Sequence, residues 1–344
     1  MKGFNLDLLD RQIIHALIID GRVPFSRIAA VVGVSEQTVS RRYHRLHAAT
    51  AVRVVGMPDS HRAGESKWVV RLQCVPDAAA AVADALARRA DTSWVQLTSG
   101  GTEICCMVQP LDPGSGHDLL LRQLPASRRI VAVSAHSLLH MFRGGASHWS
   151  GATEALTAEQ AVALTPPLVA PIPAPAPAPT PAPALVAGGS QAAAGLGPED
   201  RVLIAELSRD GRASYTELAH ATHWHESTVR RRVEELRAAG VLYLDVDIEE
   251  TVFGIYTRAH LWMSVAPARL AAVGSALAQH PEVPFVAATT GTSNLVSSVL
   301  FPDDQALYRY LTERIASLDG VNAVEVAPII RTVKRAATVL PPAA

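Results

Sequence analysis

Two short segments of the chain carry arginines among small polar residues, a combination that suits contact with a nucleic acid. Arginine contacts guanine edges or phosphates, glutamine suits adenine, and hydroxyl groups pair with several bases. The candidate DNA contacts in the first segment are Gln37, Thr38, Ser40, Arg41, Arg42, His44 and Arg45. Those in the second segment are Ser227, Thr228, Arg230, Arg231 and Arg232.

Helical spacing gives each segment an apolar face and a polar face. Val39, Tyr43 and Leu46 recur at positions i, i+4 and i+7, as do Val229, Val233 and Leu236. This stripe must pack on neighbouring helices, so the polar residues face outward. Arg42 and Arg232 fall at the flank, where they suit a phosphate or cover the edge of the core. The alternative is an ordinary solvated basic helix.

These segments belong to a longer repeat, since residues 6–49 align with residues 196–239 without a gap. Identical residues include Asp10 and Asp200, the runs 20–22 and 210–212, and the arginine pairs at 41–42 and 231–232. Solenoid repeats are much shorter than this spacing. The chain therefore reads as two copies of one subunit fused head to tail, which predicts a symmetric DNA reader made within one chain.

Each copy begins with a predicted three-helix, helix-turn-helix domain. In the first copy, Gly33-Val34-Ser35 forms the turn, and Ser35 is placed to cap the third helix. The second copy has His223-Trp224-His225 there, which predicts a distorted or only partly functional turn. Glu234 and Glu235 also oppose phosphates, so we expect the first copy to supply most of the DNA affinity. Thr50 stands where the second copy has Gly240, which predicts a different end for the third helix.

The rest of each copy alternates strands and helices in the order βαββαβ, the ferredoxin-like arrangement. In the first copy the predicted strands are 67–74, 93–99, 103–108 and 130–142, with helices at 77–90 and 117–124. In the second copy they are 259–265, 284–289, 295–301 and 321–333, with helices at 267–279 and 303–318. Glycines at 100–101 and 291 fall where a turn needs positive φ.

Composition limits the remaining possibilities. Hydrophobic residues make up 49% of the 344 residues, which indicates a globular chain. The formal net charge is −1, so any electrostatic attraction to DNA must come from local patches of positive charge. Cys74, Cys105 and Cys106 have neither disulfide nor metal spacing, which favours a reducing, cytoplasmic location. No apolar segment is long enough to cross a membrane. A Pro/Ala-rich stretch between the copies predicts an extended linker.

The chain resembles the leucine-responsive regulatory protein/AsnC (Lrp/AsnC) family of transcription regulators. The resemblance rests on LDLLDRQII, the two DGR runs, GVSEQTVSRRYHRL, STVRRRVEELRAAGVL and LDGVNAVEVAPIIRTVK. It implies an α+β fold in which DNA-binding domains, at 1–56 and 196–250, precede ferredoxin-like modules at 64–148 and 255–338. The linker then spans 149–195. We expect an intramolecular pseudo-dimer that reads an imperfect palindrome, with successive major-groove faces about one helical turn apart.

The same resemblance implies that the α+β modules bind a small effector, usually an amino acid, and self-associate. The effector turn of the family usually reads Gly-x-Tyr-Asp, and neither copy keeps its aromatic residue or aspartate. The candidate effector contacts are Gly100, Gly101, Thr102, Glu103, Gly291, Thr292, Ser293 and Asn294. Glu103 can replace the aspartate, and backbone N–H groups at the turns suit a carboxylate. A hairpin without a ligand role is the alternative.

Other classes of function remain open. Sirohaem decarboxylases share this two-part architecture, and an enzyme of that kind needs histidine and arginine in the α+β module to hold an anionic tetrapyrrole. The candidates for that role are His61, Arg62, Arg258 and His260. A protein-interaction module that has lost DNA binding is a further alternative. The spacing of His220, His223 and His225 does not converge on a metal, so we expect neither a metal nor a cofactor, and no enzymatic activity.

Overall fold

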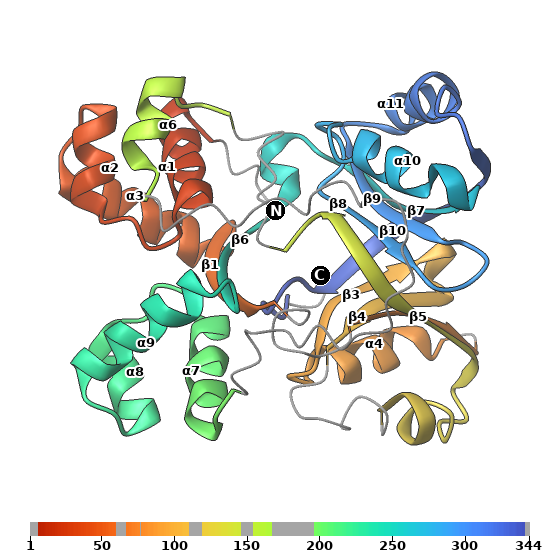
Figure 1. Ribbon diagram of the computed structural model, residues 1–344, viewed down its shortest axis with the longest axis horizontal. Helices are drawn as coiled ribbons and strands as arrows, with labels where there is room; N and C mark the ends of the chain where they lie inside the picture. Colours follow the sequence, from red (N-terminus) through yellow and green to blue (C-terminus); the bar gives the residue numbers. More distant parts are fainter. Residues whose placement is uncertain are drawn as a thin grey trace, which may run out of the picture.

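The computed structural model describes residues 6–59, 67–75, 77–109, 119–145, 154–166 and 196–340. Figure 1 shows two helical groups on one side of the molecule and a strand-rich body on the other. The first group contains α1 (Leu8–Ile19), α2 (Phe25–Val32), α3 (Glu36–Ala48) and α6 (Ala158–Leu164). The second contains α7 (Pro198–Arg209), α8 (Tyr215–Thr222) and α9 (Glu226–Ala238).

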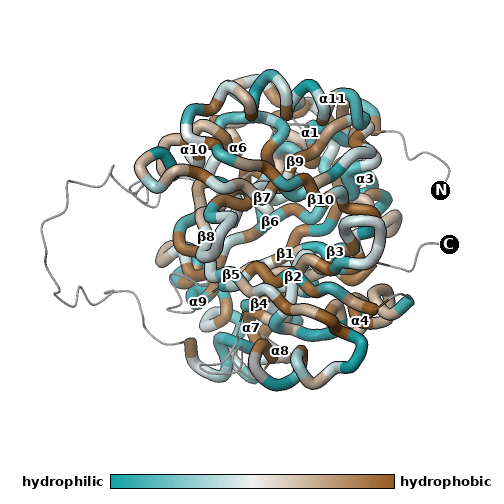
Figure 2. Tube along the Cα trace, turned by 90° about the vertical axis from the view of Figure 1, so that its right-hand side faces the viewer, coloured by the Kyte–Doolittle hydropathy of each residue, from teal (hydrophilic) through white to brown (hydrophobic). Residues whose placement is uncertain are grey.

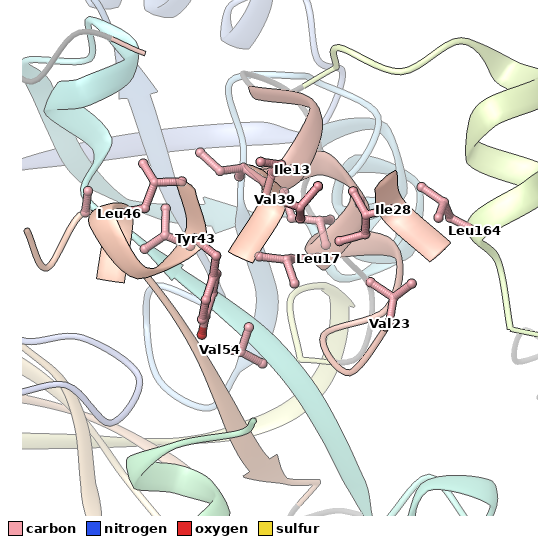
Figure 3. Close-up of a cluster of buried hydrophobic side chains, with 14 of the residues drawn as sticks. Ile13, Leu17, Val23, Ile28, Val39, Tyr43, Leu46, Val54 and Leu164 are labelled. Carbon is pink, nitrogen blue, oxygen red and sulfur yellow. The ribbon is translucent and has the colours of Figure 1, made fainter. Parts of the chain in front are cut away.

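The first helical group has the core that its periodicity predicts. Val39 and Leu46 on α3 are fully buried against Ile13 and Ile28 of α1 and α2. Figure 3 shows these side chains converging, with Tyr43 and Val54 closing one end. The second group repeats the arrangement with Val229, Val233 and Leu236. The polar faces of α3 and α9 are thereby turned away from both cores.

The turn of the second copy is not distorted, contrary to the expectation from its sequence. His223 ends α8 with φ 58°, and Gly33 ends α2 with φ 74°, so both occupy the left-handed region. Packing between the helices holds a side chain in a conformation that glycine adopts more easily. The cap is lost as expected, since Ser35 accepts from the Thr38 amide while His225 makes no side-chain cap.

The third helices also end alike, so the expected difference between Thr50 and Gly240 was wrong. Thr50 has φ 53° and Gly240 has φ 67°. In both copies the next amide turns back onto the helix, from Ala51 to the Leu46 carbonyl and from Val241 to the Leu236 carbonyl. Threonine accepts the left-handed conformation here at a cost that glycine avoids.

A two-stranded antiparallel ribbon, which the sequence analysis missed, joins the two helical groups. It consists of β1 (Val52–Pro58) and β6 (Leu242–Ile248). Val55 pairs with Asp245, its own counterpart in the repeat, so the two copies are related by a pseudo-twofold at this point. In Figure 1 the ribbon lies between the helical groups and the strand-rich body.

Helix α6 lies within the range assigned to the linker. Thr157 and Gln160 form a capping box at its start, and Leu164 is fully buried against the first helical core. Arg27 donates to the Ala163 carbonyl over 2.6 Å, and Gln160 donates to the Val31 carbonyl over 3.1 Å. Residues 154–166 are therefore part of the first helical group, while the Pro/Ala-rich stretch at 167–195 lies outside the described residues.

The strand-rich body is a closed barrel with the order β10-β3-β4-β2-β5-β8-β9-β7. Its first-copy strands are β2 (Trp68–Cys74), β3 (Thr92–Thr98), β4 (Glu103–Val108) and β5 (Ile130–Arg143). Its second-copy strands are β7 (Thr257–Val265), β8 (Phe285–Thr289), β9 (Leu295–Phe301) and β10 (Val321–Lys334). The α+β fold class and its duplicated arrangement are confirmed.

The long strands β5 and β10 close the barrel by pairing with both copies. β5 pairs with β2 and β8, while β10 pairs with β7 and β3. Helix α4 (Ala79–Ala87) covers one side, and α10 (Leu270–Leu277) and α11 (Asp304–Arg309) cover the other (Figure 1). Two π-helical segments, Leu119–Gln123 and Tyr310–Ile315, replace parts of the predicted helices at 117–124 and 303–318.

Apolar side chains fill three regions of the barrel. Two clusters lie under the helices, one for each copy. A third, containing Val69, Cys105 and Trp262, joins residues of both copies. Figure 2 shows the strands running between outer layers of helices, with hydrophobic stretches along them. The barrel is therefore a packed body, and any ligand must enter where this packing is incomplete.

Candidate functional site

All the predicted contacts on the outward face of α3 are at least partly exposed. Gln37, Arg41, His44 and Arg45 are exposed, while Thr38, Ser40 and Arg42 are half-buried. On α9, Ser227, Arg230 and Arg231 are exposed, while Thr228 and Arg232 are half-buried. Exposure alone does not make a side chain available, because several of these arginines have partners within the chain.

Two arginines of α3 bind a buried carboxylate. Asp10 is fully buried, and it accepts from Arg42 over 3.2 Å and from Arg45 over 2.5 Å. Arg42 also pairs with Asp7. The Asp10 backbone N–H and, after it, Arg42 lower the pKa of Asp7, while the bond to Asp7 raises the pKa of Arg42. Arg42 therefore ties α3 to the start of α1. The sequence held a signal for this role, since Asp and Arg are retained together in both copies.

The arginines of α9 are more fully engaged than those of α3. Arg232 pairs with Asp200 over 2.7 Å, the counterpart of the Arg42–Asp10 pair. Arg231 lies 3.6 Å from Glu235, and Arg230 lies 3.8 Å from Glu226 while stacking over the Tyr215 ring. Carboxylates thus lie near all three of these predicted DNA contacts.

Two further arginines, which the sequence analysis did not assign, fix the helical groups to each other. Arg22 donates to the carbonyls of Gly211 and Ala213, both over 2.8 Å. Arg212 donates in return to Gly21 over 2.7 Å and to Val23 over 3.1 Å. Each guanidinium also stacks over an aromatic ring of the opposite copy, Tyr215 or Phe25. The two recognition helices are held in one fixed relation by these reciprocal contacts.

The first predicted effector turn has open backbone but no free carboxylate. Gly100 and Gly101 have φ of 78° and 83°, and nothing lies within 4 Å of a Cβ placed on either. Glu103 is buried and accepts from Arg71 over 2.8 Å and from the Thr98 hydroxyl over 3.0 Å. The Ser99 hydroxyl donates to it as well, over 3.0 Å. Glu103 therefore already has a full set of donors.

The second turn contacts the first copy on one side, although Gly291 and Thr292 are exposed. The Nδ1 atom of His136 lies 2.7 Å from the Thr290 carbonyl oxygen, and 2.5 Å from where a Cβ on Gly291 would stand. Asn294 binds both backbone groups of Val265, over 2.8 and 2.9 Å. Thr292 and Ser293 complete this tight loop, and the Ser293 carbonyl accepts from the Thr289 hydroxyl. These residues hold strands together.

A cavity of about 160 Å³ lies where the ribbon meets the barrel. Its polar wall includes Lys67, Arg258 and His260, together with Asp245 and Glu250. Burial lowers the pKa of His260 to about 4, so its imidazole is neutral at pH 7. Arg258 and His260, which the tetrapyrrole alternative singled out, do lie together, whereas His61 and Arg62 lie outside the described residues. The sequence analysis did not find the cavity, because the missed ribbon forms one of its walls.

Within the described part of the chain, no group of three or more His, Cys, Asp or Glu residues is arranged to hold a metal ion. His220, His223 and His225 accordingly form no such group. No described helix is both long and apolar enough to cross a membrane.

Comparison with known proteins agrees with this architecture. The family model of the AsnC-type helix-turn-helix domain matches residues 6–47 and 200–237, and that of the Lrp/AsnC ligand-binding domain matches residues 258–339. An uncharacterized HTH-type transcriptional regulator of Pyrococcus horikoshii is 33% identical over 137 residues, which are 40% of this chain and 86% of that protein. An HTH-type transcriptional regulator of Mycobacterium tuberculosis is 31% identical over 131 residues, which are 37% of this chain and 86% of that protein.

By class, the chain is a helix-turn-helix transcription regulator with a ligand-binding module. The chain belongs to the Lrp/AsnC family of transcription regulators, and each relative corresponds to about one of its two copies. Among solved structures, the siroheme decarboxylase NirDL shares the whole fold, with a TM-score of 0.60 and 14% identity. That match covers 96% of this chain and 93% of NirDL, and it is a likeness of fold.

Proposed function

We propose that this regulator reads duplex DNA sequence-specifically as an intramolecular pseudo-dimer. One observation carries the proposal: the reciprocal contacts of Arg22 and Arg212 fix two recognition helices on either side of a shared ribbon. In separate subunits such a relation requires dimerisation, and here one chain supplies both halves. Two helices held in this way suit adjacent major-groove faces of one duplex.

The two copies contribute unequally in this proposal. Arg41 is exposed on α3, whereas its counterpart Arg231 lies near Glu235. Glu234 and Glu235 add negative charge to the face that would approach phosphates, at the positions where α3 has His44 and Arg45. Copy 1 therefore supplies most of the affinity, and the preferred site is an imperfect palindrome. Base contacts come from Gln37, Thr38 and Arg41, near the start of α3.

A small effector modulates this binding, and chains associate further through the α+β modules. The support for an effector is the family's ligand-binding domain, which matches the second module. The turns at 100–103 and 291–294 are candidate contacts, although Glu103 already has three donors and Asn294 holds a strand. The open backbone at Gly100 and Gly101 is the part of these turns best suited to a ligand carboxylate.

The proposal is tested by selecting genomic fragments that the purified chain retains and then titrating one selected site at several salt concentrations. Sequence-specific binding predicts an enriched two-part motif and an affinity that falls steeply with salt, because phosphate contacts release counterions. A protein-interaction module without DNA binding would enrich no motif. An affinity independent of salt would contradict contacts made through arginine.

A tetrapyrrole enzyme is the second candidate, favoured by Arg258 and His260 meeting in one cavity. The residues present do not fit that ligand. Both ring nitrogens of His260 are engaged, Nε2 with Gln96 Oε1 at 2.7 Å and Nδ1 with Ser298 Oγ at 3.0 Å, so neither is free for iron. Asp245 and Glu250 also offset Lys67 and Arg258, whereas a tetrapyrrole with many carboxylates needs surplus positive charge. Visible absorbance after incubation with an iron tetrapyrrole would support the enzyme.

A further inference from the structure

The cavity lies between the part of the molecule that faces DNA and the barrel. Met57, Tyr243 and Val246 of the ribbon line one wall, and Ile18 of α1 reaches it too. The barrel supplies the opposite wall from strands of both copies, including Gln96 and His260. A molecule bound here contacts both parts at once. Its position differs from the turns at 100–103 and 291–294, none of whose residues line it.

Much of the lining is aromatic or sulfur-containing. Trp94, Met107, Met141 and Phe285 surround the barrel side, and Met57 closes the ribbon side. Methionines adapt to the shape of an apolar guest, and aromatic rings offer large flat contact areas. A cavity of about 160 Å³ is close in size to engineered cavities of about 150 Å³ that bind benzene. The apolar part of a ligand is therefore about the size of one ring or a branched alkyl group.

A chain of hydrogen bonds runs along the polar side. Ser298 contacts His260, which contacts Gln96, and the Gln96 amide lies 3.5 Å from the Thr332 hydroxyl. Nη1 of Arg258 lies 3.3 Å from that hydroxyl and 3.3 Å from a Glu250 carboxylate oxygen. Glu250 begins the short turn that follows β6. This series of hydrogen bonds thus connects the interior of the barrel to the end of the ribbon.

Arg258 has unused donor capacity at the wall of the cavity. Its described contacts use Nη1, while its Nε–H is buried without a hydrogen-bond partner among the described residues. A buried donor without a partner is costly, so a ligand that supplies an acceptor is favoured. A planar carboxylate is the group that satisfies a guanidinium edge best, because two oxygens meet two N–H groups.

We propose that this cavity, in place of the turns at 100–103 and 291–294, is the effector site, and that it takes a small carboxylate with an aromatic or branched aliphatic body, held by Arg258. The ligand draws Arg258 from Glu250, and the end of β6 shifts with it. Because β6 carries the second helical group, binding changes the relation of the two recognition helices and hence the DNA affinity. The inference rests on the proposed function for its regulatory part, while ligand binding itself stands apart from DNA.

Titration calorimetry of the full chain without DNA tests the site. The probes are phenylacetate, 4-methylpentanoate and L-phenylalanine, with benzyl alcohol as the ligand that lacks a carboxylate. We expect saturable binding of at least one carboxylate, with one site per chain and a dissociation constant below about 10 mM. If phenylacetate binds and L-phenylalanine does not, the site rejects an ammonium group. If L-phenylalanine binds and phenylacetate does not, the site takes a zwitterion whose ammonium group is balanced by Asp245 and Glu250.

Variants locate the binding. Arg258→Gln removes the carboxylate partner, and Met141→Trp fills the apolar part while leaving Arg258 and Glu250 intact. Each should weaken binding at least tenfold. The matched control is Arg314→Gln, which removes an arginine of the second module that pairs with Glu282 outside the cavity. Thr292→Ala serves as the control for the turn. Neither control should change the affinity by more than twofold.

Several results would overturn the inference. These are an absence of binding for all three carboxylates, equal binding of benzyl alcohol, or unchanged binding in Met141→Trp. Loss of binding in Thr292→Ala alone would move the site to the turn. For regulation, the bound carboxylate should change the DNA dissociation constant at least threefold in the native protein and not in Met141→Trp. Unchanged DNA affinity with a filled cavity would refute the coupling, whereas absence of DNA binding without any probe would instead refute the proposed function.

Discussion

Two neighbouring arginines of α3 have different roles, although their sequence context is the same. Arg41 is exposed, while Arg42 turns back to Asp7 and to the buried Asp10. Helical spacing predicted which face each side chain occupies, since Arg42 was placed at the flank. It could not predict the ion pair, because Asp10 comes from another helix and its burial depends on how the helices pack.

Arg41→Ala should weaken DNA binding by about 1–3 kcal/mol, since it removes an exposed guanidinium from the recognition face. Arg42→Ala should instead lower the free energy of unfolding by about 1–3 kcal/mol, because buried Asp10 loses a partner. Fluorescence anisotropy on a selected site and urea denaturation separate the two effects.

In the second copy, Arg231→Ala should weaken DNA binding less than Arg41→Ala, because Glu235 already offsets Arg231. Replacing Arg41 and Arg42 together with alanine should likewise weaken DNA binding more than replacing Arg231 and Arg232 together. Equal losses in the two copies would contradict the unequal contribution that we propose.

Asp247 on β6 gives the protein a predictable response to pH. Burial raises its pKa to about 7, against the attraction of Arg335 and with Asp245 and Glu250 adding to the rise. The unfolded carboxyl titrates near pH 3.9, so between about pH 4 and pH 7 the folded protein binds a proton that the unfolded chain has lost. Stability should therefore fall as pH rises through this window, by on the order of 4 kcal/mol.

Asp247→Asn should flatten this dependence and make the protein more stable at pH 8, as measured by urea denaturation across pH 4.5–8. Because folding raises the pKa of Asp247, its contribution to the free energy of unfolding is complete below the pKa of the unfolded chain. That contribution is lost as the pH rises through the pKa of the folded protein. Native protein whose stability increases from pH 5 to pH 8, with the variant following the same slope, would show that Asp247 is not the group responsible.

The helix starts in the two copies form a natural comparison. Ser35 caps α3, and His225 begins α9 without a side-chain cap. Ser35→Ala should lower the free energy of unfolding by about 1 kcal/mol, and His225→Ser should raise it by about 1 kcal/mol through a bond to the Thr228 amide. Thermal unfolding of both variants measures the difference. A His225→Ser protein that melts below the native one would mean that His225 has a contact that serine cannot replace.

Periodicity and turn residues predicted most of the elements. The strand at Leu295–Phe301 has its expected bounds, and so does Glu103–Val108, because alternation and flanking glycines define both locally. The ribbon was missed because β1 and β6 pair only with each other, although they lie far apart in the sequence. The sequence of α6 looked like linker, since one buried leucine and a capping box give too weak a pattern. Barrel closure depends on pairing between copies, and no local signal encodes it.

The duplicated architecture depends on a close approach at Gly21 and at its counterpart Gly211. A Cβ on Gly21 would lie 2.8 Å from Val54 Cγ1 and 3.0 Å from Leu244 Cβ, so the ribbon could not stay in place. Gly21→Ala should therefore lower the free energy of unfolding by about 1–3 kcal/mol and weaken binding to a two-part DNA site. Gly197→Ala is the matched control, because its φ of −67° suits alanine and nothing lies nearer than 3.6 Å to the new Cβ. Equal loss of stability in Gly197→Ala would contradict the close approach.

The fixed relation of α3 and α9 is tested most directly by changing the DNA instead of the protein. On the selected two-part site, we insert about half a helical turn, and in a second duplex about one full turn, between the half-sites. Because Arg22 and Arg212 hold the two helical groups rigidly, both insertions should reduce the affinity to that of a single half-site. If the full-turn insertion, or both insertions, left the affinity unchanged, the helical groups would act as independent readers and the pseudo-dimer would be refuted.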